Sequence, residues 1–108
     1  MLIASYDQTQ CGRYTNHILT IEGHANYSDS GTDIVCAAVS ILVQTLASIL
    51  IIAKYADNCV IEEKDGTITS ISYKADPTDQ SIATSFQFVA EGMELLSERY
   101  PDHISIEG

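Results

Sequence analysis

The sequence predicts an α+β fold, a small two-layer sandwich in which a mixed, mostly antiparallel sheet packs against two helices. Three observations predict it: short alternating segments occur in pairs, a long uncharged segment follows the first pair, and an amphipathic segment follows the second. The expected order is β-β-α-β-β-α-β. Because the chain has 108 residues, 45% of them apolar, we expect a single domain over residues 1–108.

The first pair of predicted strands comprises residues 2–7 and 17–22, which alternate as strands do. The segment between them, residues 8–16, contains Cys11-Gly12 and is predicted to be a turn. We therefore expect the thiol of Cys11 to be exposed.

The second pair comprises residues 58–63 and 67–74. Asp65-Gly66 joins them, and this dipeptide is a strong short-range signal for a hairpin. Cys59 lies in the first of these strands and is expected in the core. Residues 103–106 alternate again and predict a last strand.

The first helix is expected to begin at Asp33 as its N-cap residue, and residues 34–53 carry no charge. A segment of 20 residues is long enough to span a bilayer. Polar side chains nevertheless recur every four residues along it, at Cys36, Ser40, Gln44 and Ser48. Polar groups at mid-membrane are costly, so we expect no membrane span. A helix buried around most of its circumference, against the sheet and a subunit partner, is preferred.

The second helix is predicted from Asp76-Pro77-Thr78-Asp79, with Asp76 as N-cap and Pro77 at the first helical position. Pro101 is expected to end it. Apolar residues recur at helical spacing and predict the buried face, namely Ile82, Phe86, Val89, Met93 and Leu96.

The formal charge of −10, from 15 acidic and 5 basic residues, argues against nucleic-acid binding, which needs a basic patch. It suits a basic partner, although acidity that serves solubility alone is an equal alternative. The three cysteines lack metal-ligand spacing. The first residues lack the basic region of a leader, so we expect a cytoplasmic protein. We expect neither a metal nor a cofactor.

His24 and Cys36 flank a polar loop that leads into the first helix. If Asp33 is the N-cap, Cys36 lies in the first turn, where the helix dipole favours a thiolate. A neighbouring imidazole can activate the thiol further, so the pair is interpreted as a nucleophile and its general base. The alternative is that Cys36 is a small buried side chain and His24 an ordinary surface residue.

Other residues near this pair are assigned supporting roles. Asp33 is expected to hold the first turn or orient the imidazole, and Ser40 lies one turn further along the same face. Gly23 and Gly31 bound the loop and are candidate hinges. A zinc site formed by His24, Asp33 and Cys36 is a weak alternative.

The segments Gly23-His24-Ala25, Gly31 and Asp33-Ile34-Val35-Cys36-Ala37-Ala38-Val39-Ser40 resemble the motif of the ribosomal-processing cysteine protease family, Prp. The order of predicted elements matches that family along the whole chain. The resemblance implies an endopeptidase that removes a short N-terminal extension from a bacterial large-subunit ribosomal protein. It also implies a Cys–His dyad, which falls on Cys36 and His24, and a homodimer whose glycine-bounded loop closes over the substrate.

A second hypothesis comes from a different class of protein. The chain would then be a non-catalytic acidic module that binds a basic ribosomal partner, with Cys36 in a structural role. Such a module has no need of a histidine–cysteine pair, so the pairing favours the enzyme.

Overall fold

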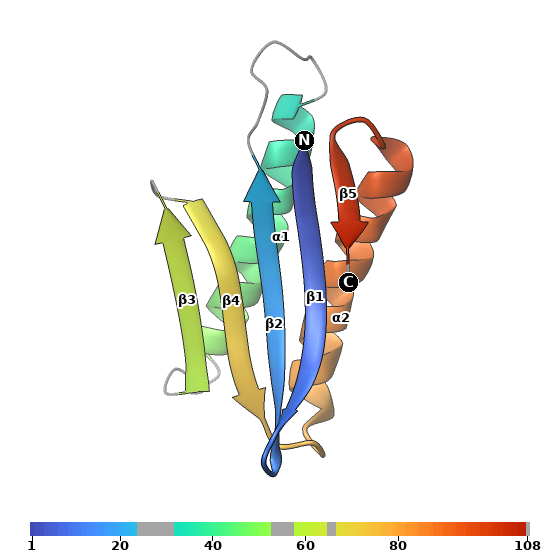
Figure 1. The fold of residues 1–108 in the computed structure, drawn as a ribbon. Coiled ribbons are helices and arrows are strands. Elements are labelled where there is room, and N and C mark those ends of the chain that lie inside the picture. The colour runs from blue at the N-terminus through green and yellow to red at the C-terminus, as the bar shows by residue number, and fades with distance from the viewer. Residues whose placement is uncertain (24–31, 53–57, 65–66, 108) are drawn as a thin grey trace.

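The computed structural model describes residues 1–23, 32–52, 58–64 and 67–107, with the backbone alone at Thr32, Asp33 and Ile52. Within these ranges a five-stranded sheet has the order β3-β4-β2-β1-β5, and two helices cover one of its faces (Figure 1). The elements are β1 Leu2–Cys11, β2 Tyr14–Gly23, α1 Thr32–Ile52, β3 Cys59–Lys64, β4 Thr67–Ala75, α2 Gln80–Arg99 and β5 Ile104–Glu107. The predicted α+β class and element order are confirmed.

The hairpin of β1 and β2 is longer than predicted. The two strands pair without interruption from Leu2 opposite Gly23 to Cys11 opposite Tyr14. The predicted turn over residues 8–16 is therefore wrong, because only two residues separate the strands. Gly12 takes a φ of 65° there, a conformation that glycine adopts without steric cost.

The sheet is mixed because of β5. This strand runs parallel to β1, with Leu2 opposite Ile104, whereas the other neighbouring strands are antiparallel. Lys64 and Thr67, which flank the predicted turn between β3 and β4, are paired, as the predicted hairpin requires. Asp65 and Gly66 themselves lie outside the described residues.

The core lies between the sheet and the helices. Alternate residues of β2 and β4, among them Leu19, Ile71 and Tyr73, are buried against α1 and α2. On α2 the predicted apolar face is confirmed, since Ile82, Phe86, Val89 and Met93 are buried and Leu96 packs against them. The helices approach closely at Gly92, where an added Cβ would lie 3.0 Å from Cδ1 of Leu42.

Helix α1 is buried along one side only. Its core positions are Val35, Val39, Val43, Leu46, Ala47 and Leu50. The opposite side exposes isoleucines, such as Ile41 at 62% and Ile34 at 55%. In the single chain, one sheet and one neighbouring helix cover one side of α1. The expectation of burial around most of its circumference includes a subunit partner, so it stays a prediction.

By length and composition, the segment Ile34–Ile51 of α1 could cross a membrane. Core helices pass the same test, so this is weak evidence for a span. In the described structure, 33% of the segment is buried, and that part packs against the sheet and α2.

The N-cap of α2 is Asp79, and the prediction of Asp76 is wrong. The Asp79 carboxylate accepts bonds from the backbone N–H groups of Ser81 and Ile82, at 3.2 and 3.4 Å. Asp76 instead closes the preceding turn, where its carboxylate accepts the backbone N–H of Thr78 at 2.9 Å. These bonds keep the pKa of Asp76 below its usual value.

Candidate active site

Cys36 lies close to the start of α1 but not in its first turn. The helix begins at Thr32, so Cys36 is its fifth residue and Asp33 its second. The predictions of Asp33 as N-cap and of Cys36 in the first turn are both wrong, because each residue lies further into the helix than predicted. Because each helical N–H bonds to the carbonyl four residues earlier, the N–H of Cys36 bonds within the helix, and the unpaired N–H groups end at Ile34.

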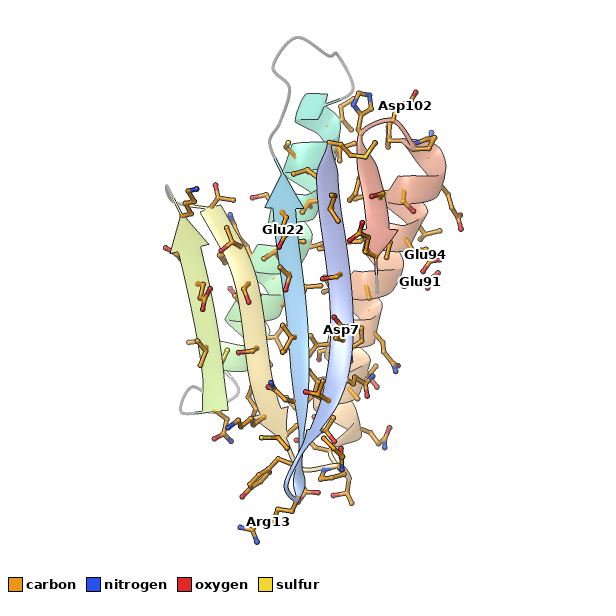
Figure 2. The ribbon with its side chains drawn as sticks, in the orientation of Figure 1. Asp7, Arg13, Glu22, Glu91, Glu94 and Asp102 are labelled. Carbon is orange, nitrogen blue, oxygen red and sulfur yellow. The ribbon has the colours of Figure 1, made fainter. Side chains whose placement is uncertain are left out.

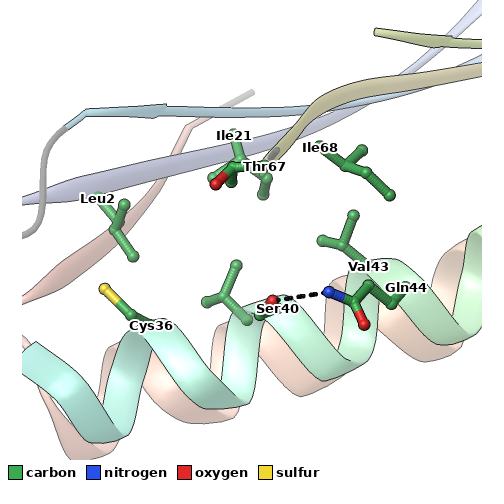
Figure 3. Close-up of a pocket in the computed structure, with 9 residues that line it drawn as sticks. Leu2, Ile21, Cys36, Ser40, Val43, Gln44, Thr67 and Ile68 are labelled. Atoms are coloured by element: carbon green, nitrogen blue, oxygen red, sulfur yellow. Dashed lines mark hydrogen bonds between the residues drawn. The ribbon is translucent and has the colours of Figure 1, made fainter. Parts of the chain in front are cut away.

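A small pocket opens beside the Cys36 thiol, between α1 and the end of the sheet (Figure 3). Its volume is about 80 Å³. The helix contributes Cys36, Val39, Ser40, Val43 and Gln44, and the sheet contributes Leu2, Ile21, Thr67 and Ile68. The half-buried thiol therefore borders an apolar space that one side of α1 shares with three strands.

Ser40 lies where the sequence places it, one helical turn after Cys36 on the same pocket wall. It is not alone there, because Nε2 of Gln44 donates a hydrogen bond of 3.1 Å to Oγ of Ser40. This pair gives an otherwise apolar wall a polar strip that continues from the thiol.

The end of β2 brings the chain to the same pocket. Gly23 is the last residue of β2, and its partner in the sheet is Leu2, which lines the pocket with Cys36. Gly23 has a φ of 107°, and a Cβ there would collide with the carbonyl oxygen of Met1. This position requires glycine for reasons of space and of conformation. Its role as a loop hinge stays a prediction.

The histidine of the predicted dyad is not among the described residues. His24 and Gly31 lie outside them, as does the side chain of Asp33. The structure therefore does not test the pairing of His24 with Cys36, nor the zinc alternative. Among the side chains that the structure does describe, no group of three His, Cys, Asp or Glu residues could hold a metal ion.

The other two cysteines lie away from the pocket. Cys11 is an exposed free thiol at the end of β1, as predicted. Cys59 is half-buried on β3 and packs against the core, where burial raises the pKa of its thiol. Neither lines the pocket that Cys36 borders.

Most of the pocket could not be found from the sequence. The helix side of the pocket can be predicted from the sequence, because its residues follow helical spacing, namely Cys36, Val39, Ser40, Val43 and Gln44. Gln44 belongs to the polar stripe that the sequence predicts on this helix, but the sequence does not assign it to the site. Leu2, Ile21, Thr67 and Ile68 meet only through the pairing of β1, β2 and β4, and single strands carry no signal for their partners.

The charges surround the molecule unevenly. Asp7 and Glu22 lie on the face of the sheet that the helices leave open, and Glu91, Glu94 and Asp102 lie around α2 and the turn after it (Figure 2). Arg13 lies in the β1–β2 turn, at the opposite end of the hairpin from the pocket. Lys64 pairs with Thr67 of the pocket wall, so the pocket end carries charges of both signs.

Comparison with known sequences defines the class of protein as the cysteine proteases. The sequence model of the family described as cysteine protease Prp matches residues 8–105. The chain therefore belongs to the Prp family, and it is a hydrolase.

Two curated relatives support the assignment. The ribosomal processing cysteine protease Prp of Mycoplasma pneumoniae is 30% identical over 93 residues, which cover 86% of this chain and 88% of that protein. The protein of the same name from Mycoplasma genitalium is 28% identical over 93 residues, 85% of this chain and 88% of its own.

Solved structures share the fold. A crystal structure of the essential ribosomal processing protease Prp from S. aureus with a substrate peptide superposes with a TM-score of 0.73 at 21% identity, covering 99% of this chain and 98% of that one. SMU.848 from Streptococcus mutans has a TM-score of 0.63 at 26% identity, covering 99% and 92%.

Proposed function

We propose that this protein is an endopeptidase that removes a short N-terminal extension from a bacterial large-subunit ribosomal protein, with Cys36 as nucleophile and His24 as general base. The observation that carries the proposal is the position of Cys36 at a pocket beside the end of β2, from which the chain continues directly to His24. The curated relatives are named as ribosomal processing proteases, which supports the substrate class.

The register of the sheet supports the pairing of the two residues. His24 follows Gly23, and Gly23 is paired with Leu2, which shares a pocket with Cys36. Gly23, to which His24 is bonded, thus ends its strand beside a residue of the pocket wall. A general base has to come within hydrogen-bond reach of the proton that it takes, and this tether favours such an approach.

The reaction follows from these roles. Sγ of Cys36 attacks the scissile carbonyl carbon while His24 takes the thiol proton, and the imidazolium then protonates the leaving amine. Water, activated by the same imidazole, hydrolyses the thioester and regenerates the thiol. Because the N–H groups of Cys36 and Ala37 bond within α1, we place the donors to the oxyanion among the unpaired N–H groups at the start of the helix, which end at Ile34.

The charge of the chain fits the substrate. Ribosomal proteins are basic, and the formal charge here is −10. A cytoplasmic location belongs to the same proposal, because it is where ribosomal proteins are made.

The decisive experiment is to incubate the purified protein with the ribosomal protein precursor and to sequence the product. We expect one cut near the N-terminus, which Cys36→Ser abolishes while binding remains. Cys11→Ser and Cys59→Ala are the matched controls and should cleave at near-normal rates. Binding without cleavage by the wild-type protein would favour the non-catalytic acidic module instead.

We further propose that a second copy of the chain covers the outer side of α1 and α2, as a homodimer. A groove of about 420 Å³ lies between the helices there, and Phe88 is 74% exposed beside it. In a two-fold interface the same patch of both copies is in contact, so the patch has to be complementary to itself. Here Phe88 projects from the patch and the apolar groove lies beside it. The described side chains of α1 carry no charge that would oppose burial.

Sedimentation measures the oligomeric state. Phe88→Ser should convert the dimer to a monomer, whereas Val60→Ser should not, because Val60 is 58% exposed on β3 and does not line the groove. A monomeric wild-type protein would contradict the proposal. Binding of that monomer to lipid vesicles would assign the exposed isoleucines to a membrane surface instead.

A further inference from the structure

Gln44 extends the line of polar side chains that begins at the proposed nucleophile. It lies two helical turns after Cys36 and one turn after Ser40, on the same side of α1. Figure 3 shows Ser40 between the thiol and the amide of Gln44. The amide nitrogen Nε2 of Gln44 donates a hydrogen bond of 3.1 Å to Oγ of Ser40. The three side chains thus follow one another along the helix, and the last two are bonded.

The bond from Gln44 restricts the direction of the Ser40 hydroxyl. A serine hydroxyl carries one proton and accepts on its oxygen, whereas the amide nitrogen of glutamine only donates. Because the amide N–H points at Oγ, the Ser40 proton has to point away from Gln44. Hydroxyls in helices are commonly directed at the residue four positions earlier, as Thr45 is when it donates to the Ile41 carbonyl at 2.6 Å. For Ser40 the residue four positions earlier is Cys36.

A hydroxyl proton directed at the turn of Cys36 favours the ionised thiol. The positive end of the O–H dipole lies on the side of the sulfur, and such a group stabilises the thiolate relative to the thiol. The surroundings strengthen this effect, since the half-buried thiol borders the apolar side chains of Leu2 and Val39. Hydrogen bonds in a chain also polarise one another, so the bond from Gln44 makes Ser40 a better donor.

The other charges around the thiol do not depend on Gln44. Among the described residues that line the pocket, Cys36 is the only one that titrates. Titratable groups of the adjoining strands and turn come next to this wall, namely the Met1 amino group, Glu22, Lys64 and His103. An uncharged substitution at Gln44 leaves these groups and the proposed base His24 as they are, so their effects cancel between the wild-type protein and the variant.

We propose that Gln44 is a positioning residue of this site: it holds the Ser40 hydroxyl with its proton toward Cys36, and Ser40 in turn stabilises the thiolate. The inference rests on the proposed function, since it takes Cys36 as the nucleophile. Eight residues of helix, a rise of about 12 Å, separate Gln44 from Cys36, so Gln44 acts through Ser40 and not on the sulfur itself. Its effect therefore has to disappear when Ser40 loses its hydroxyl.

The pH dependence of Cys36 alkylation by iodoacetamide tests the proposal without a known cleavage sequence. The thiolate displaces iodide and forms a thioether, so the rate follows the ionised fraction of the thiol. Trypsin cleaves after Arg13 and Lys54, which leaves Cys36 on a peptide apart from Cys11 and Cys59. The rate at each cysteine is then measured separately in one sample, and the exposed Cys11 is the internal reference.

Gln44→Met keeps the length of the side chain and removes the donor. Gln44 is exposed and methionine is a good helix former, so the variant keeps the fold. We expect the midpoint of the pH profile of Cys36 to rise by about half a unit, a fall of about threefold in rate below the midpoint, with little change at the high-pH plateau. Loosened packing would instead change the plateau and speed the labelling of Cys59. Ser48→Ala is the matched control, because Ser48 continues the polar stripe but does not line the pocket.

A double-mutant cycle decides whether Gln44 acts through Ser40. Ser40→Ala should shift the profile of Cys36 at least as far as Gln44→Met does, and Gln44→Met should add nothing to Ser40→Ala. An unchanged profile in Gln44→Met, or an equal shift with and without the Ser40 hydroxyl, would overturn the inference and leave Cys36 as the nucleophile. If wild-type Cys36 reacts no faster than Cys11, the nucleophile and the inference are overturned together.

Discussion

The hydroxyl oxygen of Tyr6 lies 2.8 Å from Nδ1 of His17, inside the layer between the sheet and α2. The His17 ring is stacked on Phe86, with 5.2 Å between the ring centroids, and Tyr6 is stacked on the same phenylalanine at 5.6 Å. Three elements, β1, β2 and α2, thus meet at one aromatic cluster. His17 is only 3% exposed, so its charge state affects how well the two layers pack.

Burial lowers the pKa of His17 below its usual value near 6.5. The unfolded chain then takes up the proton more readily than the folded one. The stability that neutral His17 provides is fully present above about pH 6.5 and is lost as the pH falls below that value. We expect the free energy of unfolding to decrease as the pH is lowered from about 7.5 to about 5.

The substitution His17→Gln tests this assignment, because the glutamine amide keeps a hydrogen-bonding group at this position but does not titrate. Chemical denaturation of both proteins across this range should show a smaller loss in His17→Gln. Asp76 does not disturb the comparison, since its lowered pKa keeps it ionised throughout. Equal pH slopes in the two proteins would exclude His17 as the source.

The sequence predicts the elements well, because strand alternation and the apolar face of α2 are local patterns. Leu19 and Ile71 are buried, and Phe86 faces the sheet, as these patterns require. The errors concern boundaries that depend on backbone geometry. Residues 8–11 form a strand because they pair with residues 14–17. No local pattern within residues 8–11 predicts this pairing.

The candidate site, too, can be predicted from the sequence only in part. The sequence identifies Cys36 and Ser40 because both belong to one motif and one helix face. It does not identify Leu2 or Ile68, which reach the pocket through strand pairing. The sequence does not predict the cluster of Tyr6 and His17 for the same reason, since 11 residues separate two side chains that touch only across β1 and β2.

Asp79→Ala should lower the free energy of unfolding by about 1 kcal/mol, because it removes the N-cap of α2. The carboxylate of Asp79 accepts two backbone N–H bonds and the hydroxyl of Ser81, at 2.6 Å. Asp76→Ala is the matched control in the same turn and should cost less, since Asp76 caps no helix. Urea titration measures both, and a larger loss from Asp76→Ala would contradict the assigned cap.

Gly23→Ala should destabilise the protein by about 2 kcal/mol or more, since the new Cβ meets the Met1 carbonyl at a φ of 107°. Gly12→Ala is the control, because Gly12 also has a positive φ but no described atom within 4 Å of the added Cβ. We expect a loss nearer to about 1 kcal/mol there. Thermal unfolding compares the two, and equal losses would show that the Met1 contact contributes nothing.

His24→Ala should lower the rate of precursor cleavage about a hundredfold or more, the usual contribution of a general acid–base group. Cys36 should also become slower to alkylate at neutral pH. His103→Ala is the informative control, because the backbone carbonyl of His103 accepts the N–H of Leu2 at 2.9 Å, which places it at the same end of the sheet. A large loss in His103→Ala with normal His24→Ala would reassign the base.

The acidic surface should steer a basic substrate toward the site. Attraction between opposite charges is screened over about 8 Å at physiological salt, so the encounter rate falls as salt rises. We expect kcat/KM for a basic peptide to fall between low and high salt, while kcat at saturation changes little. Glu22→Gln, next to Gly23 at the pocket end of β2, should reproduce part of that fall, whereas Asp7→Asn, five residues beyond Leu2 along β1, should not. A neutral peptide with the same cleavage sequence is the reference. Equal salt dependence for the two peptides would mean that the charge of −10 serves solubility alone.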